Sequence, residues 1–159
     1  MPIYLVRHAK AGSRHDFEGD DQERPLTNAG RLQASEVCKR LAAMSPSVVV
    51  SSPYRRCVET VEPLAVAIDI DVTLDERLAE FGSDLVKADA SLFDLLYSLP
   101  DNAVVCSHGD VIPAVVEALA ASGMRTHGTA EWGKGSVWVL QREHNRFVDA
   151  NAWAPPQID

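Results

Sequence analysis

The sequence predicts an α/β fold with a mixed, mostly parallel sheet and helices on both of its faces. Two observations carry this prediction. Short apolar runs of strand length alternate along the chain with segments whose apolar residues recur at helical spacing. A length of 159 residues also suits one domain around a single core, which we take to be residues 1–159. We therefore expect a single-domain, three-layer sandwich.

The expected elements can be placed in order. Strands are predicted at residues 3–6, 48–50, 103–106 and 137–140, and helices at residues 29–44, 54–68, 89–98 and 110–122. For the first helix, we expect Thr27 or Asn28 as the N-cap and an apolar face made by Leu32, Val37, Leu41 and Met44. The C-terminal SVWVLQREHNRFVDANAW reads as two strands joined by a turn near His144 and Asn145, forming an antiparallel edge.

Two segments are predicted to be loops. The acidic HDFEGDDQE, residues 15–23, is interpreted as a solvated surface loop that helps to keep the protein in solution. Residues 76–89, ERLAEFGSDLVKAD, have weak periodicity and contain a glycine. Stretches of this length and character are typical of active-site loops.

Composition excludes several classes of function. The net charge of −8 argues against a nucleic-acid-binding surface, and no apolar run approaches the roughly 20 residues of a membrane span. Met1-Pro2 leads directly into the first strand, so we expect no signal peptide and a cytoplasmic location. The three cysteines lack CxxC spacing and are expected to pack as small apolar side chains.

Three predicted strands end on residues suited to phosphate chemistry. The first ends on Arg7 and His8, and another ends at His108-Gly109. In VVVSSPYRRC a strand leads into a helix whose first turn contains Arg55 and Arg56. The helix dipole disfavours cations in a first turn, unless an anion lies between the arginines and the backbone amides. Because ligands bind beyond the carboxyl ends of strands in open α/β sheets, these residues are predicted to form one site.

The chemistry available to such a site is narrow. Neutral imidazole is a good nucleophile toward phosphorus, and guanidinium groups match phosphate oxygens in pairs. Phosphoryl transfer depends on positioning and charge stabilisation, so no metal is needed if Arg7, Arg56 and His108 supply enough positive charge. We therefore expect a phosphohistidine intermediate on His8 and no cofactor.

Three other phosphate-related patterns are set aside. DIDVT, residues 69–73, matches the DxDxT of magnesium-dependent aspartate phosphatases, but it follows a helical run and alternates like an edge strand. GTAEWGK, residues 128–134, approaches a P-loop, yet Gly135 stands where Ser or Thr must hold magnesium, and a strand follows. No cysteine has an arginine at the sixth following position, and the histidines lack metal-ligand spacing such as HExxH.

Four ordered motifs resemble one known family. They are VRHA at residues 6–9, ERPLTNAG at 23–30, SSPYRRCVET at 51–60 and CSHGD at 106–110. Together they resemble the RHG, PLTxxG, SSPxxRAxxT and SHG signatures of the histidine phosphatase superfamily, also called the phosphoglycerate mutase-like family. Ala9 replaces the usual Gly of the RHG signature.

The resemblance implies a role for each matching residue. His8 would be the nucleophile, and Arg7, Arg56 and His108 would form the phosphate pocket, with Arg55 pointing elsewhere. We also assign Gly109 and Ser13 to substrate binding. LAEFG, residues 78–82, is similar to the family's LxE segment and would make Glu80 the general acid; the alternative is that Glu80 is a solvated loop residue.

Within the superfamily, the short chain is most similar to SixA-type phosphohistidine phosphatases. The segment GKGSVWVL, residues 133–140, is also similar to the phosphatase domain attached to some actinobacterial Nudix hydrolases. The resemblance implies a phosphohistidine on a protein as the substrate. The alternatives are a phosphatase of small phosphometabolites or nucleotides, and a non-catalytic phosphate-binding module. The sequence does not indicate an oligomeric state.

Overall fold

The structure is a computed structural model that describes residues 1–81 and 89–158. Its strands are β1 (Pro2–Arg7), β2 (Val49–Ser51), β3 (Val72–Leu74), β4 (Val104–Ser107), β5 (Arg125–His127), β6 (Val137–Glu143) and β7 (Arg146–Trp153). Its helices are α1 (Asn28–Ala42), α2 (Arg55–Ala67), α3 (Ala90–Ser98) and α4 (Val111–Ala121), with single 3-10 turns η1 (Asp21–Glu23) and η2 (Glu76–Leu78). None of the helices within these ranges is both long and apolar enough to cross a bilayer.

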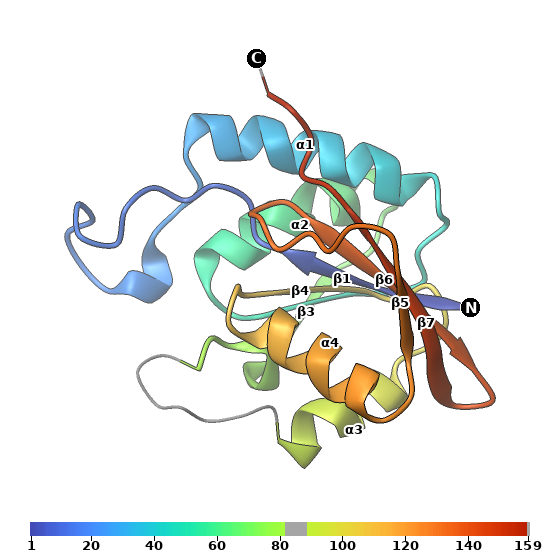
Figure 1. Ribbon diagram of the computed structural model, residues 1–159. Helices are drawn as coiled ribbons and strands as arrows, with labels where there is room; N and C mark the ends of the chain where they lie inside the picture. Colours follow the sequence, from blue (N-terminus) through green and yellow to red (C-terminus); the bar gives the residue numbers. More distant parts are fainter. Residues whose placement is uncertain (82–88, 159) are drawn as a thin grey trace.

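The strands form one seven-stranded sheet in the order β3-β2-β4-β1-β6-β7-β5 (Figure 1). The first four of these are parallel to one another. β6 pairs antiparallel with both β1 and β7, and β5 pairs parallel with β7. The predicted mixed, mostly parallel sheet is therefore confirmed.

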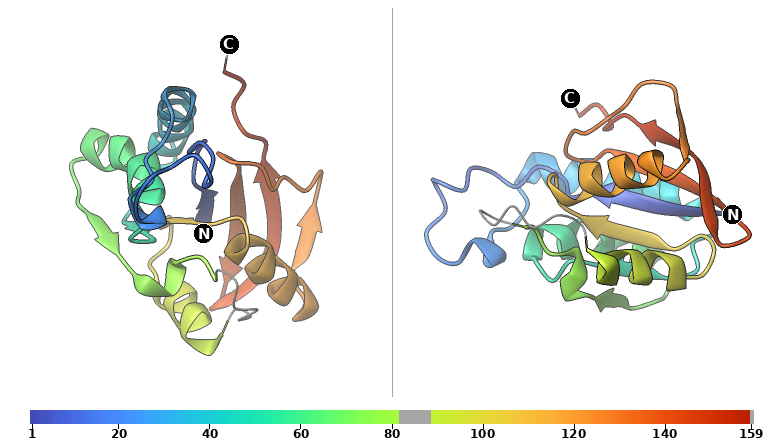
Figure 2. Two further views of the ribbon diagram at one scale, coloured as in Figure 1. Left: turned by 90° about the vertical axis from the view of Figure 1, so that its left-hand side faces the viewer. Right: turned by 60° about the horizontal axis from the view of Figure 1, so that its bottom comes forward.

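Helices cover both faces of this sheet, as the sequence predicts (Figures 1 and 2). Alternate residues of β1 serve the two faces because successive side chains in a strand point in opposite directions. Ile3 and Leu5 pack in a core with residues of α3 and α4, whereas Tyr4 and Val6 pack in a second core with residues of α1 and α2. The sheet is thus buried on both sides, which rigidly fixes the ends of its central strands.

Helix α1 differs in one respect from its predicted amphipathic face. Thr27 is the N-cap, and its side-chain oxygen accepts a hydrogen bond from Gly30 N at 3.0 Å. Val37 and Leu41 are buried as expected, but Leu32 is 57% exposed. Five residues separate Leu32 from Val37, which corresponds to about 500° of helical rotation and so places Leu32 far from the buried stripe.

The C-terminal region contains one strand that the sequence did not predict. The turn at His144 and Asn145 joins β6 to β7 as expected, and both turn residues have positive φ. However, β7 is not the edge, because β5 pairs along its outer side. All three residues of β5 are exposed, so no apolar alternation marks it in the sequence.

The register brings the predicted strand ends together. Arg7 on β1 lies opposite Ser107 on β4, and Ser51 on β2 lies opposite Cys106. The loops that follow β1, β2 and β4 therefore leave the sheet at the same edge. In Figure 1 the blue segment that leads from β1 to α1 projects beyond this edge.

Candidate active site

His8 directly follows β1 and lines a cavity beyond the carboxyl ends of the parallel strands. Its backbone N–H donates to Ser107 O at 3.1 Å, and its ring Nδ1 lies 2.8 Å from Ala9 O. A carbonyl oxygen can only accept, so Nδ1 carries the hydrogen in this contact. The lone pair of the neutral ring is consequently on Nε2, the nitrogen that this contact leaves available.

The surroundings keep His8 uncharged. Burial lowers the pKa of His8 from 6.5 to about 3, and the positive charges of Arg56, Arg7 and Lys134 act in the same direction. The hydrogen bond to Ala9 opposes the shift without reversing it. At neutral pH His8 is therefore a neutral imidazole, which is the form that can attack an electrophile.

His108 lies beside His8, at the end of the neighbouring strand β4. The two rings meet edge to face with centroids 5.5 Å apart. The Nε2 of His108 lies 2.8 Å from Ser52 Oγ, and Tyr54 packs against the same ring at 4.8 Å. Burial, followed by the proximity of His8 and the charge of Arg56, lowers the pKa of His108 to about 2.

One atom of His108 lacks a hydrogen-bond partner in the described part of the chain. This atom is Nδ1, which lies 3.8 Å from Glu80 Oε2. Ser52 Oγ already accepts from Tyr54 N at 3.3 Å, so its hydroxyl hydrogen is available to His108 Nε2. In that arrangement Nδ1 carries a hydrogen that no protein group within residues 1–81 and 89–158 accepts.

Two arginines enter the cavity from different elements. Arg56, in the first turn of α2, is 1% exposed and holds Asp21 O at 2.9 Å and Glu80 Oε2 at 3.0 Å. Arg7, at the end of β1, donates to Trp132 O at 2.6 Å. The Nε atoms of both arginines are buried without a partner among the described residues. By contrast, Arg55 pairs with Glu59 at 3.0 Å and its side chain is 48% exposed.

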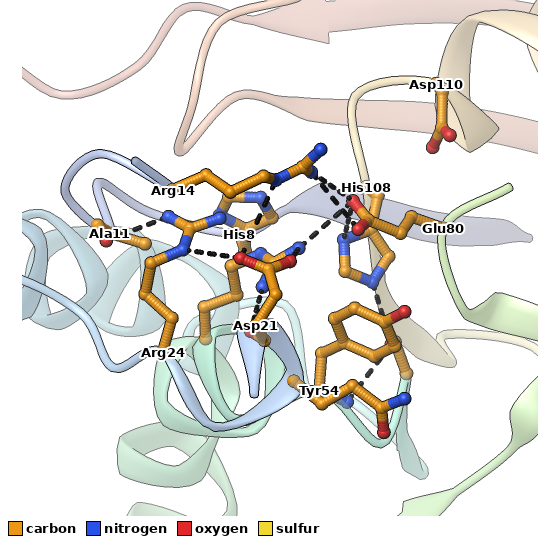
Figure 3. A network of polar contacts seen from close by, with 12 residues as sticks. His8, Ala11, Arg14, Asp21, Arg24, Tyr54, Glu80, His108 and Asp110 are labelled. Carbon is orange, nitrogen blue, oxygen red and sulfur yellow. Dashed lines mark hydrogen bonds and ion pairs between the residues drawn. The ribbon is translucent and has the colours of Figure 1, made fainter. Parts of the chain in front are cut away.

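Glu80 faces the cavity between these cations. Its side chain is 16% exposed, and Arg14 Nη2 holds its Oε1 at 3.2 Å while Arg56 holds its Oε2 (Figure 3). A solvated loop position, the alternative considered for Glu80, would have left this carboxylate in water. The geometry instead places a carboxylate within reach of both His108 and Arg56.

The cavity has a volume of about 620 Å³ and mainly polar walls. Its lining includes three histidines, five cations and two carboxylates, namely His8, His15, His108, Arg7, Arg14, Arg24, Arg56, Lys134, Glu80 and Asp110. A pocket of cations around an imidazole lone pair suits a phosphate group that is attacked by nitrogen.

Comparison with known families agrees with this geometry. Residues 3–88, more than half of the chain, match the model of the histidine phosphatase superfamily (branch 1). The chain belongs to the histidine phosphatase superfamily. The match includes the segments that carry Arg7, His8, Arg56 and Glu80.

Among curated proteins, the chain is similar to an 8-oxo-(d)GTP phosphatase of Mycolicibacterium smegmatis. The two are 33% identical over 156 residues, which cover 97% of this chain and 48% of that protein. It is also similar to the probable phosphoglycerate mutase GpmB of Salmonella choleraesuis, with 34% identity over 82 residues that cover 50% of this chain and 38% of the mutase. The chain thus spans about half, or less, of the length of these relatives.

Solved structures of other proteins show the same fold. The putative phosphohistidine phosphatase SixA from Agrobacterium tumefaciens has a TM-score of 0.66 and 23% identity, covering 89% of this chain and 91% of that one. A protein histidine phosphatase SixA complexed with tungstate has a TM-score of 0.70 and 19% identity, covering 98% and 97%. At these identities the likeness concerns the fold.

The superfamily signature is altered here at Ala9. Ala9 is fully buried and packs in a small cluster with Ala11, Leu26 and Ala34. Its backbone N–H donates to Thr60 Oγ1 at 3.0 Å. The side chain is accommodated in this cluster, and Ala9 is not part of the lining of the cavity within the described residues.

The segment expected to be a solvated acidic loop contributes to the site. Asp21 lies against Arg56, with its Oδ2 at 3.2 Å from Arg56 Nη2. Burial raises the pKa of Asp21, but the hydrogen bond from Arg24 and the charge of Arg56 outweigh it, so the pKa lies below its usual range. The interpretation of this segment as a solvated loop is therefore incomplete, because Asp21 pairs with Arg24 nearby and with Arg56, which is 35 residues away in the sequence.

Arg24 ties this loop to the start of the chain. It is 7% exposed and donates to Ala11 O and Gly12 O, both at 2.9 Å. The RPLT segment that contains Arg24 was recognised in the sequence, but without a role for this residue. Ser13, which the sequence assigned to substrate binding, also lines the cavity.

Lys134 is a further site residue that sequence reasoning missed. It belongs to GTAEWGK and to GKGSVWVL, and neither segment assigns it a role in phosphate binding. Lys134 lines the cavity, and burial together with the charges of Arg7, Arg24 and Arg56 lowers its pKa. The signal in the sequence was the lysine itself, but its distance from the other motifs concealed its role.

The DIDVT segment lies away from the site. β3 runs parallel to β2, with Val72 opposite Val49 and Leu74 opposite Ser51. Asp69 and Asp71 precede β3, so they lie at the amino ends of the strands, the edge opposite to His8. Among the residues that the structure describes, no three His, Cys, Asp or Glu side chains are grouped so that they could hold a metal ion.

Part of the predicted active-site loop falls outside the described ranges. Residues 76–81 are described and carry Glu80, whereas Gly82 of the LAEFG motif lies among residues 82–88, outside them.

Proposed function

We propose that the protein is a metal-independent phosphatase in which His8 is the nucleophile. The observation that carries this proposal is the contact between His8 Nδ1 and Ala9 O, which leaves the lone pair on Nε2 of a neutral ring. Arg7, Arg56 and His108, which share the cavity with His8, are the phosphate-binding groups.

In the first step, Nε2 of His8 attacks phosphorus and forms an N–P bond while the bond to the leaving oxygen breaks. Glu80 donates its proton to that oxygen. In the second step, water attacks the phosphohistidine, the N–P bond breaks, and Glu80 takes the proton from water. His8 returns to its neutral form and inorganic phosphate leaves.

Binding of phosphate prepares Glu80 for this role. The oxygens of the phosphate compete with Glu80 for Arg56, which holds it at 3.0 Å. Once Arg56 binds the phosphate, the carboxyl group of Glu80 is free to turn toward the leaving oxygen. The buried Nδ1 of His108 and the buried Nε atoms of Arg7 and Arg56 supply hydrogen-bond donors for the phosphate oxygens.

Two classes of substrate fit this chemistry. The first is a phosphohistidine side chain on a protein, which the sequence resemblance to SixA-type phosphatases suggests. The walls of the cavity favour a small phosphorylated molecule, because the contact between Arg14 and Glu80 at 3.2 Å joins two parts of the lining, residues 12–15 and Glu80. The name of the mycobacterial relative, an 8-oxo-(d)GTP phosphatase, also favours a nucleotide. We therefore place small phosphorylated molecules first.

Turnover of 4-nitrophenyl phosphate tests the enzymatic proposal directly. We expect His8→Ala to lose essentially all activity, and wild-type protein quenched during turnover to carry an acid-labile, alkali-stable phosphate. His127→Ala is a matched control, since His127 is an exposed residue of β5. Normal activity in His8→Ala would overturn the mechanism, and a wild type that binds phosphate without turnover would indicate a binding module.

A second assay separates the substrate classes. The rate constants for a phosphohistidine-bearing carrier protein and for a panel of nucleotides and sugar phosphates would be measured side by side. We expect the larger kcat/KM values among the small molecules, and a clear preference for the carrier protein would reverse that order.

A further inference from the structure

A second cavity adjoins the one that contains His8. It has a volume of about 630 Å³ and shares Arg7 and Lys134 with the first cavity. Its other walls are Lys10, Gln33 and the C-terminal segment Pro155–Ile158. A single molecule could thus contact both cavities on either side of Arg7 and Lys134.

The cations of the second cavity are unusually free of carboxylates. Arg7, Lys10 and Lys134 form no ion pair within the described residues, and no carboxylate is part of the described lining. By contrast, Arg14 and Arg56, which line the first cavity alone, both form ion pairs with Asp21 and Glu80. Positive charge is therefore concentrated at this place in a chain with a net charge of −8, and the Asp110 carboxylate, which lines the first cavity, offsets part of the charge of Arg7.

The backbones of Lys10 and Lys134 are held by one buried side chain. Gln33 is 2% exposed; its Oε1 accepts from Lys10 N at 3.1 Å, and its Nε2 donates to Lys134 O at 2.7 Å. Gly135 N additionally lies 3.2 Å from Arg7 O. The three cations therefore come from two segments that are locked together, which is what a preorganised anion site requires.

Mutual repulsion among these cations is evident from Lys134. Burial lowers the pKa of Lys134, and the charges of Arg7, Arg24, Arg56 and Lys10 lower it further. One phosphate in the first cavity would be bound by Arg7 and Arg56. A second anion next to it would relieve the repulsion among Arg7, Lys10 and Lys134.

We propose that the second cavity binds a second phosphate group of the substrate, held by Arg7, Lys10 and Lys134. This inference rests on the proposed function and narrows its substrate class to small molecules that carry two phosphate groups. The hydrolysed phosphate lies at His8 and the other lies beyond Arg7. Two sources share this chemistry: a terminal diphosphate, as in a nucleoside diphosphate, and a bisphosphate whose two groups are on separate carbon atoms.

The test compares substrates that differ by one phosphate. The values of kcat/KM would be measured on the full chain for AMP, ADP, adenosine 3′,5′-bisphosphate and 4-nitrophenyl phosphate. We expect one of the two doubly phosphorylated nucleotides to exceed AMP by at least about tenfold, because each hydrogen bond to a charged group contributes roughly 1.5–3 kcal/mol. The preferred one identifies whether the two phosphates are directly linked or separate.

Substitutions of the two lysines test whether the second cavity causes the preference for doubly phosphorylated substrates. Lys10→Gln and Lys134→Gln should each reduce the ratio of kcat/KM for the doubly phosphorylated substrate to that for 4-nitrophenyl phosphate by roughly tenfold. Lys39→Gln is the matched control, since Lys39 is an exposed residue of α1 that pairs with Glu36 at 3.0 Å. An unchanged ratio in Lys10→Gln, or a wild type that prefers AMP, overturns the proposal.

A binding measurement separates this proposal from the proposed activity. Calorimetric titration with inorganic pyrophosphate and with inorganic phosphate requires no turnover. We expect pyrophosphate, or the bisphosphate nucleotide, to bind at least about tenfold more tightly than phosphate, and this advantage to disappear in Lys10→Gln. If 4-nitrophenyl phosphate is not hydrolysed but the tighter binding of two phosphates is observed, the proposed activity is wrong and the second phosphate site is supported. If the affinities are equal, the second phosphate site is wrong and the proposed activity is unaffected.

Discussion

Gly109 and Arg7 lie so close that a Cβ atom added to Gly109 would be 2.6 Å from Arg7 Cζ. The two residues come from neighbouring parallel strand ends, β4 and β1. Only a residue without a side chain lets the guanidinium group lie across the backbone at this position. The SHG motif therefore shapes the phosphate pocket through what Gly109 lacks, in addition to the imidazole of His108.

Gly109→Ala should weaken phosphate binding with little effect on stability. The atoms that the new methyl group meets belong to the flexible end of Arg7, so the side chain moves and the backbone does not have to. We expect the inhibition constant of inorganic phosphate to rise by roughly tenfold and the free energy of unfolding to change by less than about 1 kcal/mol. Competitive inhibition and urea unfolding measure the two quantities; an unchanged inhibition constant would contradict the close approach.

The free energy of unfolding should fall as the pH decreases below 6.5. The pKa values of His8 and His108 are about 3 and about 2 in the folded chain, against an ordinary value of 6.5 for histidine. Between these values the unfolded chain binds protons at both residues and the folded chain does not, so acid favours unfolding. Above pH 6.5 both states are neutral at these residues, and their contribution to the pH dependence disappears.

Urea unfolding at pH 7.5 and pH 5.0 tests this linkage, since carboxylates are still largely ionised at pH 5.0. Each buried histidine should lower the free energy of unfolding by about 2 kcal/mol between the two values. His8→Asn should remove roughly one histidine's share of the difference. Equal stability at both pH values would show that His8 and His108 titrate in the folded chain much as in the unfolded one.

Glu80→Gln should affect substrates according to their leaving groups. An alkoxide is a poor leaving group, so loss of a general acid slows alkyl phosphate hydrolysis by about a hundredfold or more. A protonated imidazole leaves easily, so phosphohistidine cleavage should fall by less than about tenfold. Comparison of kcat values for both substrates is the measurement. Equal losses would indicate a structural role for Glu80, which also holds Arg14 and Arg56 in place.

Activity should survive treatment with excess EDTA, and Asp69→Asn should remain active. Asp69 lies before β3, at the edge of the sheet opposite to His8, so it cannot reach the phosphate that His8 attacks. Hydrolysis of 4-nitrophenyl phosphate in EDTA, with and without added magnesium, measures the dependence. Loss of activity in EDTA that magnesium restores would favour a metal-dependent mechanism.

Much of this protein is determined by local sequence. The alternation of Ile3, Tyr4, Leu5 and Val6 is sufficient to specify a strand buried on both faces, because successive side chains point to opposite sides. The N-cap at Thr27 and the turn at His144-Asn145 likewise follow from residues that are adjacent along the chain. The strand-end positions of His8 and His108 follow from the same local patterns.

Other features depend on contacts between distant residues. Asp21 looks like part of a solvated acidic loop until Arg56, 35 residues away, is folded against it. Lys134 joins the site because Gln33, 101 residues away, holds its backbone. β5 forms because its backbone pairs with β7, although its own residues are all exposed. Local sequence determines backbone conformation and burial. The charges around a side chain depend instead on which distant groups the completed sheet brings near it, and only the tertiary structure decides which groups these are.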